Sequence, residues 1–152
     1  MMRTRVRYQG DSDTRFLLES LKTAHGNLLA AIEELARLMD APLPSSDLLI
    51  NVRWNLSKAS LDRRLLWGRI HLELARRVDA DSEDALRSLQ DIDMRLLRAS
   101  AAHVSEWTPS AVKQDWDGYR QASAIMRRKM LEGIEAERRL LYPILESLSE
   151  QT

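Results

Sequence analysis

The chain has no cysteine, few glycines and prolines, and no net charge. Without cysteine it can form neither disulfides nor thiolate-ligated zinc sites, and it has no thiolate nucleophile. Its 23 basic and 23 acidic side chains cancel, so no overall field attracts nucleic acid or an anionic membrane. We therefore expect no nucleic-acid or membrane partner, and any recognition must use local surfaces.

Long apolar runs are also missing. The N-terminal stretch "MMRTRVRYQGDSD" is basic and lacks the apolar core of a signal peptide, and no later stretch is apolar enough to span a bilayer. A cytoplasmic protein is the expectation. The 152 residues suit one domain, predicted at residues 13–149 after a flexible basic tail at residues 1–12.

The five glycines and four prolines are too few to interrupt the chain often. Breaks fall at "DAPLPSSD", "DADSED" and "EWTPS", and they separate four helices, predicted at 13–40, 46–79, 82–107 and 109–148. Each helix is preceded by residues whose side-chain oxygen can accept from free backbone N–H groups. These start signals are Asp13, Ser45 or Ser46, Asp81 or Ser82, and Thr108 with Pro109.

The apolar residues within these helices recur at alternating steps of three and four. In the first helix Leu18, Leu21, Leu28, Ile32 and Leu35 follow this spacing, which keeps one stripe of each helix facing its neighbours. Short connections between long amphipathic helices favour antiparallel neighbours. The sequence predicts an all-α fold, an antiparallel up-down-up-down four-helix bundle.

Polar residues interrupt these stripes. His25, Arg63 and Glu137 occupy positions where an apolar residue is expected, and Gly133 lies four residues before Glu137, on the same face. A rise of ~1.5 Å per residue places the three polar residues at similar heights. They could form a buried polar cluster. In the other interpretation, Arg63 extends its head group to the surface and Glu137 meets a neighbouring arginine in solvent.

Two stretches, "TAHGNLLAAIEEL" and "IEAERRLLYPIL", resemble the hemerythrin-like, or HHE cation-binding, four-helix bundles. The resemblance implies that a pair of iron ions, or another cation pair, would sit in the core on histidines and carboxylates. His25 matches the first-helix histidine and Glu137 the fourth-helix carboxylate. Gly133 stands in place of the fourth-helix histidine, and Arg63 near the second-helix ligands. The resemblance therefore implies a degenerate member that lacks most metal ligands.

One histidine and one carboxylate cannot replace the hydration shells of two cations. Arg63 also brings a permanent positive charge that repels a cation and pairs with a carboxylate. We therefore expect no metal and no cofactor, and a vestigial site or buried polar cluster at His25, Arg63, Gly133 and Glu137. The alternative is a cation- or oxygen-sensing protein with an incomplete iron site on His25 and Glu137.

The stretch "RWNLSKASLDRRLLWGR" combines arginine with tryptophan, a pairing favoured at interaction hot spots. It indicates an interaction surface for a protein partner or a homodimer; the plainer interpretation is an ordinary helix with tryptophans at the bundle edge. Glycine-rich phosphate loops and nucleophile motifs are absent, so we expect a non-catalytic binding or regulatory protein and no enzyme. The candidate interaction residues are Arg53, Trp54, Lys58, Arg64 and Trp67.

Overall fold

A computed structural model describes the backbone of residues 2–150 and the side chains of residues 13–150. The part of the chain so described contains helices and no strand, which confirms the predicted all-α class. The helices are α1 (Met2–Met39), α2 (Ser46–Leu74), α3 (Ala80–Glu106), α4 (Pro109–Gln114) and α5 (Trp116–Ser149).

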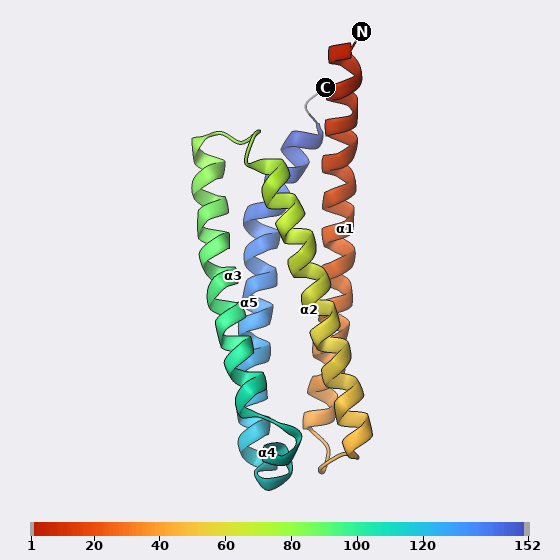
Figure 1. The fold of residues 1–152 in the computed structure, drawn as a ribbon, viewed down its shortest axis with the longest axis vertical. Coiled ribbons are helices and arrows are strands. Elements are labelled where there is room, and N and C mark those ends of the chain that lie inside the picture. Colours follow the sequence, from red (N-terminus) through yellow and green to blue (C-terminus); the bar gives the residue numbers. More distant parts are fainter. Residues whose placement is uncertain (1, 151–152) are drawn as a thin grey trace.

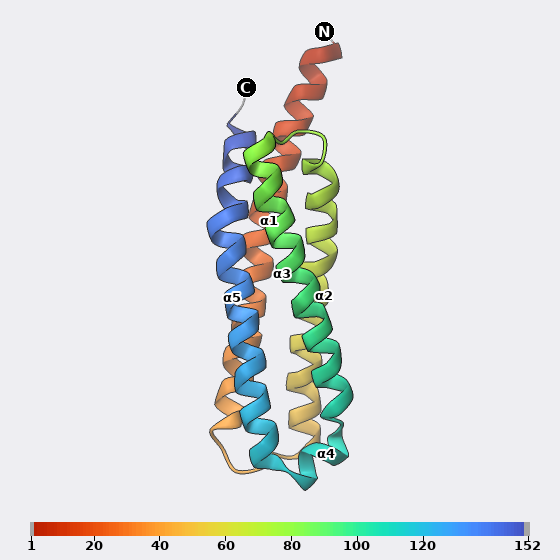
Figure 2. The ribbon, with the colours of Figure 1, turned by 90° about the vertical axis from the view of Figure 1, so that its left-hand side faces the viewer.

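The four longer helices lie side by side along the long axis of the molecule, and the short α4 lies at one end (Figures 1 and 2). Helix α1 packs against α2 and α5, and α3 packs against α5. Helices α2 and α3 approach each other less closely, and a cavity opens between them. No helix among residues 2–150 combines the length and the apolar character needed to cross a bilayer.

Four of the helices begin at a side-chain cap. Ser45 Oγ accepts from Leu48 N at 3.3 Å, as the sequence predicts for α2. Thr108 caps α4, with Pro109 in the first turn, which is also the predicted arrangement. For α3 the predicted start, at Asp81 or Ser82, is wrong, because the residue that caps this helix is Asp79. The extended backbone of Asp79 brings its carboxylate within 2.8 Å of Ser82 N.

Helix α1 begins at Met2, so the start predicted at Asp13 is wrong. Residues 2–12 contain no proline, and a single glycine costs a helix only ~1 kcal/mol, so nothing there ends it. Residues 2–12 of the stretch predicted as a flexible basic tail, residues 1–12, are thus helical. Met1 and the tail's side chains lie outside the described residues, and the tail's flexibility stays a prediction.

Two further boundaries differ from the prediction. Helix α2 ends at Leu74 and gives way to a turn, in which Arg77 N donates to Leu74 O at 3.0 Å. The Arg77 side chain donates to Thr14 Oγ1 at 2.7 Å, which holds this turn against α1. The fourth predicted helix is two helices, because Asp115 leaves the helical conformation to accept from Gly118 N at 2.9 Å.

The buried apolar residues form three groups that follow one another along the molecule. One group includes Leu21, Trp67 and Leu141, the middle group includes Leu28 and Ile134, and the last, near α4, is formed by Leu35, Met39, Leu49, Val52, Val112 and Tyr119. The interruption between the first two groups is polar, and it is where the candidate site lies.

Candidate functional site

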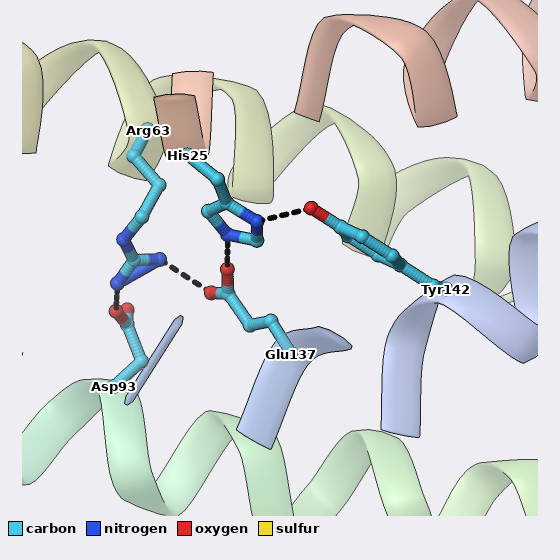
Figure 3. Close-up of polar contacts among 5 residues, drawn as sticks. All are labelled: His25, Arg63, Asp93, Glu137 and Tyr142. Atoms are coloured by element: carbon cyan, nitrogen blue, oxygen red, sulfur yellow. Dashed lines mark hydrogen bonds and ion pairs between the residues drawn. The ribbon is translucent and has the colours of Figure 1, made fainter. Parts of the chain in front are cut away.

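The candidate site is a polar cluster in the core, built from α1, α2, α3 and α5 (Figure 3). The structure brings together the three stripe residues His25, Arg63 and Glu137. Their exposed fractions are 3%, 6% and 5%, respectively, so all three are buried. Arg63 therefore does not extend to the surface, and Glu137 does not meet a neighbouring arginine in solvent.

Local helical spacing explains this position. His25 lies between Leu21 and Leu28 on α1, and each leucine belongs to a different apolar group. Glu137 lies in the same way between Ile134 and Leu141 on α5. Residues three or four apart share a helix face, so the faces that build the core must also carry these polar groups inward.

Arg63 is the centre of the cluster. Its Nη1 donates to Glu137 Oε1 at 2.6 Å, and its Nη2 donates to Asp93 Oδ1 at 2.5 Å. The guanidinium therefore joins a carboxylate of α5 to a carboxylate of α3 (Figure 3). Burying a charge is costly unless it is paired and hydrogen-bonded, and both conditions hold for Arg63.

His25 completes the cluster on the α1 side. Its Nε2 bonds Glu137 Oε2, and its Nδ1 bonds the hydroxyl of Tyr142. A neutral imidazole with its hydrogen on Nε2 fits both contacts, because Nε2–H donates to the carboxylate while Nδ1 accepts from the Tyr142 O–H. The rings of His25 and Tyr142 also stack, with centroids 5.5 Å apart.

The Tyr142 hydroxyl is held in its protonated form. Burial raises the pKa of Tyr142 to about 12, against an ordinary 10.0; Arg138 opposes the increase and the negative charge of Glu137 adds to it. A hydroxyl that keeps its hydrogen can donate to His25 throughout the neutral range. This fixes the orientation of the imidazole and of the carboxylate beyond it.

Sequence reasoning missed Asp93 and Tyr142. Asp93 follows Ile92 at the edge of the apolar stripe of α3, and its side chain is 14% exposed, compared with 7% for Arg63. The sequence did contain a signal for Asp93, because this carboxylate lies at the edge of the apolar stripe of α3 at about the height of Arg63, for which the sequence analysis had not named it as a partner. Tyr142 is five residues after Glu137, which is not a same-face helical spacing, so the sequence alone offers no comparable signal for it.

Gly133, the fourth residue predicted for this site, is buried on α5 but adds no polar contact. A side-chain Cβ built there would lie 3.4 Å from Leu96 Cδ2 on α3. Its neighbour is therefore an apolar side chain of α3.

The cluster has little spare capacity for a ligand. Both imidazole nitrogens of His25 and both carboxylate oxygens of Glu137 already bond protein groups. Within the described residues, no group of three or more histidine, aspartate or glutamate side chains is arranged to hold a metal ion. A cation would have to displace Arg63 before it could reach these donors.

The predicted interaction residues of α2 divide between two environments. Trp54 is 68% exposed and Lys58 is exposed, whereas Trp67 is buried in the core, so its assignment to a surface was wrong. Trp67 follows Arg63 by four residues and so shares its inward face. Arg53 and Arg64 are half-buried and line the cavity between α2 and α3.

The chain was also compared with known proteins. No family model, no curated protein and no solved structure matches it.

Proposed function

We propose that the chain is a hemerythrin-like protein with an antiparallel up-down-up-down four-helix bundle, in which an arginine-centred cluster takes the place of the metal pair. It acts in the cytoplasm by binding rather than by catalysis. The bundle is supported by the connections, since α1 and α2 are joined at one end of the molecule and α2 and α3 at the other (Figure 1).

The observation that carries the proposal is the guanidinium of Arg63, bonded in the core to Glu137 and Asp93. A metal ion in a bundle core bridges carboxylates of facing helices. A guanidinium can do the same electrostatically, because it is always charged and presents several donors in a fixed plane. Arg63 thus satisfies buried carboxylates that would otherwise call for a cation.

Metal analysis tests this proposal directly. Protein purified without chelator should carry no stoichiometric iron, zinc or manganese, and thermal melts with and without a strong chelator should superimpose. A bound metal stabilises the folded state by mass action, so a chelator-induced drop in melting temperature would favour the alternative, an incomplete iron site on His25 and Glu137.

A gain-of-function variant makes the test sharper. Arg63→Ala removes the guanidinium and leaves His25, Glu137 and Asp93 facing one another, and imidazole with carboxylates suits divalent transition metals. We expect Zn²⁺ or Mn²⁺ to raise the melting temperature of this variant but not of the unaltered protein. Arg69→Ala, at an exposed site on the same helix, is the matched control. An unaltered protein stabilised as much as Arg63→Ala would contradict the proposal.

A further inference from the structure

The cavity between α2 and α3 has the size and the chemistry of a small-molecule site. Its volume is about 780 Å³, within the range of roughly 300–1,000 Å³ found for ligand pockets. Core residues form part of its lining, because Leu56, Met126 and Met130 contribute apolar surface. An apolar compound placed there would contact the protein interior.

The charged residues of the cavity are all of one sign. Arg53, Arg64 and Arg127 line it, and no aspartate or glutamate among the described residues does, although the chain has as many acidic as basic residues. Arg53 is held in place: it donates to Trp107 O at 2.7 Å and lies over the Tyr119 ring at 5.5 Å. The cavity therefore favours an anion.

Two polar atoms of the lining are unpartnered. Arg64 Nε and Ser60 Oγ are buried and have no hydrogen-bond partner among the described residues. The two residues are four apart on α2 and so share a face. Buried donors of this kind normally have a partner. A carboxylate oxygen in the cavity can accept from both once the two side chains turn toward it, because both atoms are covered in this structure.

We infer that this cavity binds an amphipathic carboxylate of the medium-chain fatty-acid type. Its carboxylate accepts from Arg64 and Ser60, and its chain lies against Leu56, Met126 and Met130. The inference rests on the proposed binding function and names its ligand. The polar cluster at Arg63 is a separate site, and no metal takes part in this binding.

Decanoate, below its micellar concentration, is the probe. Isothermal titration calorimetry should give a Kd below ~1 mM for decanoate, with decanol and decyltrimethylammonium at least about tenfold weaker. Arg64→Met removes the charged hydrogen-bond donor of the carboxylate, so it should weaken decanoate binding at least about tenfold. Arg69→Met, an exposed arginine on the same helix, should leave the Kd unchanged.

No binding of decanoate would overturn the inference, as would equal binding of decanol or an unchanged Kd in Arg64→Met. These failures would leave the metal-free cluster untouched. Metal uptake by the unaltered protein would instead remove the proposed function, whatever decanoate does.

A different observation concerns the exposed face of α2, of which Ile50, Trp54 and Ser57 also line the cavity. Seven residues that follow one another at steps of four, three, four, four, three and four are exposed, and all lie within ~40° of one line on a helical projection: Ile50, Trp54, Ser57, Leu61, Leu65, Gly68 and Leu72. The five apolar side chains among them are between 48% and 73% exposed. These seven residues are called the α2 outer stripe.

The α2 outer stripe is symmetric about Leu61. Reversing the order of the steps gives the same spacing, so two copies of α2 can pair antiparallel around a twofold axis at Leu61. In that register Trp54 of one copy faces Gly68 of the other, and Ile50 faces Leu72. Gly68 has open space where a Cβ would lie, so it can accept the large indole.

The charges beside the stripe fit the same register. Lys58 and Asp62 are exposed on one flank of α2, and antiparallel pairing brings Lys58 of one copy near Asp62 of the other. Asp47, near one end of the stripe, comes near Arg76, just past the other end. Complementary charges of this kind fix register and orientation.

The geometry points to an antiparallel homodimer through the α2 outer stripe. Sedimentation velocity should show a dimer that dissociates reversibly in the micromolar range, since one helix face is near the low end of specific interface sizes, ~1,200 Å². Leu61→Arg, which places two guanidinium groups at the axis, should give a monomer. Ile125→Arg, at an exposed apolar site of α5, should leave the dimer intact.

The register has its own test because the chain lacks cysteine. Leu61→Cys should form a disulfide-linked dimer on mild oxidation, and Ile125→Cys should not. A monomer at all concentrations up to about 0.5 mM, where even a weak complex would appear, would overturn the dimer. Equal cross-linking of the two cysteine variants would overturn the register.

Discussion

The pairing of Arg63 with Glu137 can be tested by a double-mutant cycle. Arg63→Met removes the guanidinium and leaves Glu137 without its ion pair at a side-chain exposure of 7%. It also leaves Asp93 without its ion-pair partner. The Asp93 side chain is 14% exposed, so water can solvate it better and it contributes less to the loss of stability. Breaking a buried ion pair from one side costs ~3–5 kcal/mol of unfolding free energy.

The other single change is milder. In Glu137→Gln the amide oxygen can still accept from Arg63, and Arg63 keeps its bond to Asp93. The amide nitrogen would face His25 Nε2, and the imidazole can accept there by moving its hydrogen to Nδ1. We expect Glu137→Gln to cost ~1–2 kcal/mol.

The double variant measures the coupling between Arg63 and Glu137. With Glu137→Gln present, Arg63→Met no longer strands the carboxylate of Glu137, so the double change should be no worse than Arg63→Met alone. This corresponds to a coupling energy of at least ~1–2 kcal/mol, the full cost of Glu137→Gln, whereas independent sites add to within ~0.5 kcal/mol.

Denaturant melts of the two singles and the double provide the measurement, with Arg69→Met at an exposed site as the control expected within ~0.5 kcal/mol. Additive effects, each below ~0.5 kcal/mol, would mean that these side chains are solvated and that the cluster does not exist in solution.

Four further outcomes follow from the same structure. His25→Ala should cost ~1–3 kcal/mol, because it leaves Glu137 and Tyr142 without a partner; a loss below ~0.5 kcal/mol, as at a surface site, would remove His25 from the cluster. Gly133→Ala should raise the free energy of unfolding by ~0.5–1 kcal/mol in denaturant melts, because alanine favours the helix more than glycine does. The added Cβ would lie 3.4 Å from Leu96 Cδ2, which is ordinary contact, and a clear loss of stability would mean that the site is too tight for a methyl group. Asp115→Ala should cost ~1 kcal/mol by removing the α5 cap, and helix content unchanged with no loss of stability would argue against that cap. The pKa of Tyr142 is 10.0 in the unfolded chain and about 12 in the folded protein, so between these pH values the folded state keeps a proton that the unfolded state has lost. The free energy of unfolding should therefore fall as the pH rises from 10.0 to about 12. Urea melts at high pH should show a smaller fall for Tyr142→Phe, and equal falls would contradict this pKa.

The sequence alone determined the class of the fold and most of its helices. Alternating apolar steps and capping side chains are local signals, so they located helices at Ser46 and Pro109. The same spacing placed His25, Arg63 and Glu137 at similar heights, because the rise of a helix is fixed. A local signal can also mislead. Asp13 is a residue type that often starts a helix, but it lies inside α1, which begins at Met2.

Only the tertiary structure decided which side chains meet. The packing of α2 against its neighbours buries Trp67, which shares the inward face of Arg63, and leaves Trp54 exposed. Asp93 and Tyr142 joined the cluster for the same reason, since their contacts with Arg63 and His25 span helices far apart in the chain. Helical periodicity fixes the faces of one helix, but partners across helices depend on how those faces turn toward one another when the core packs.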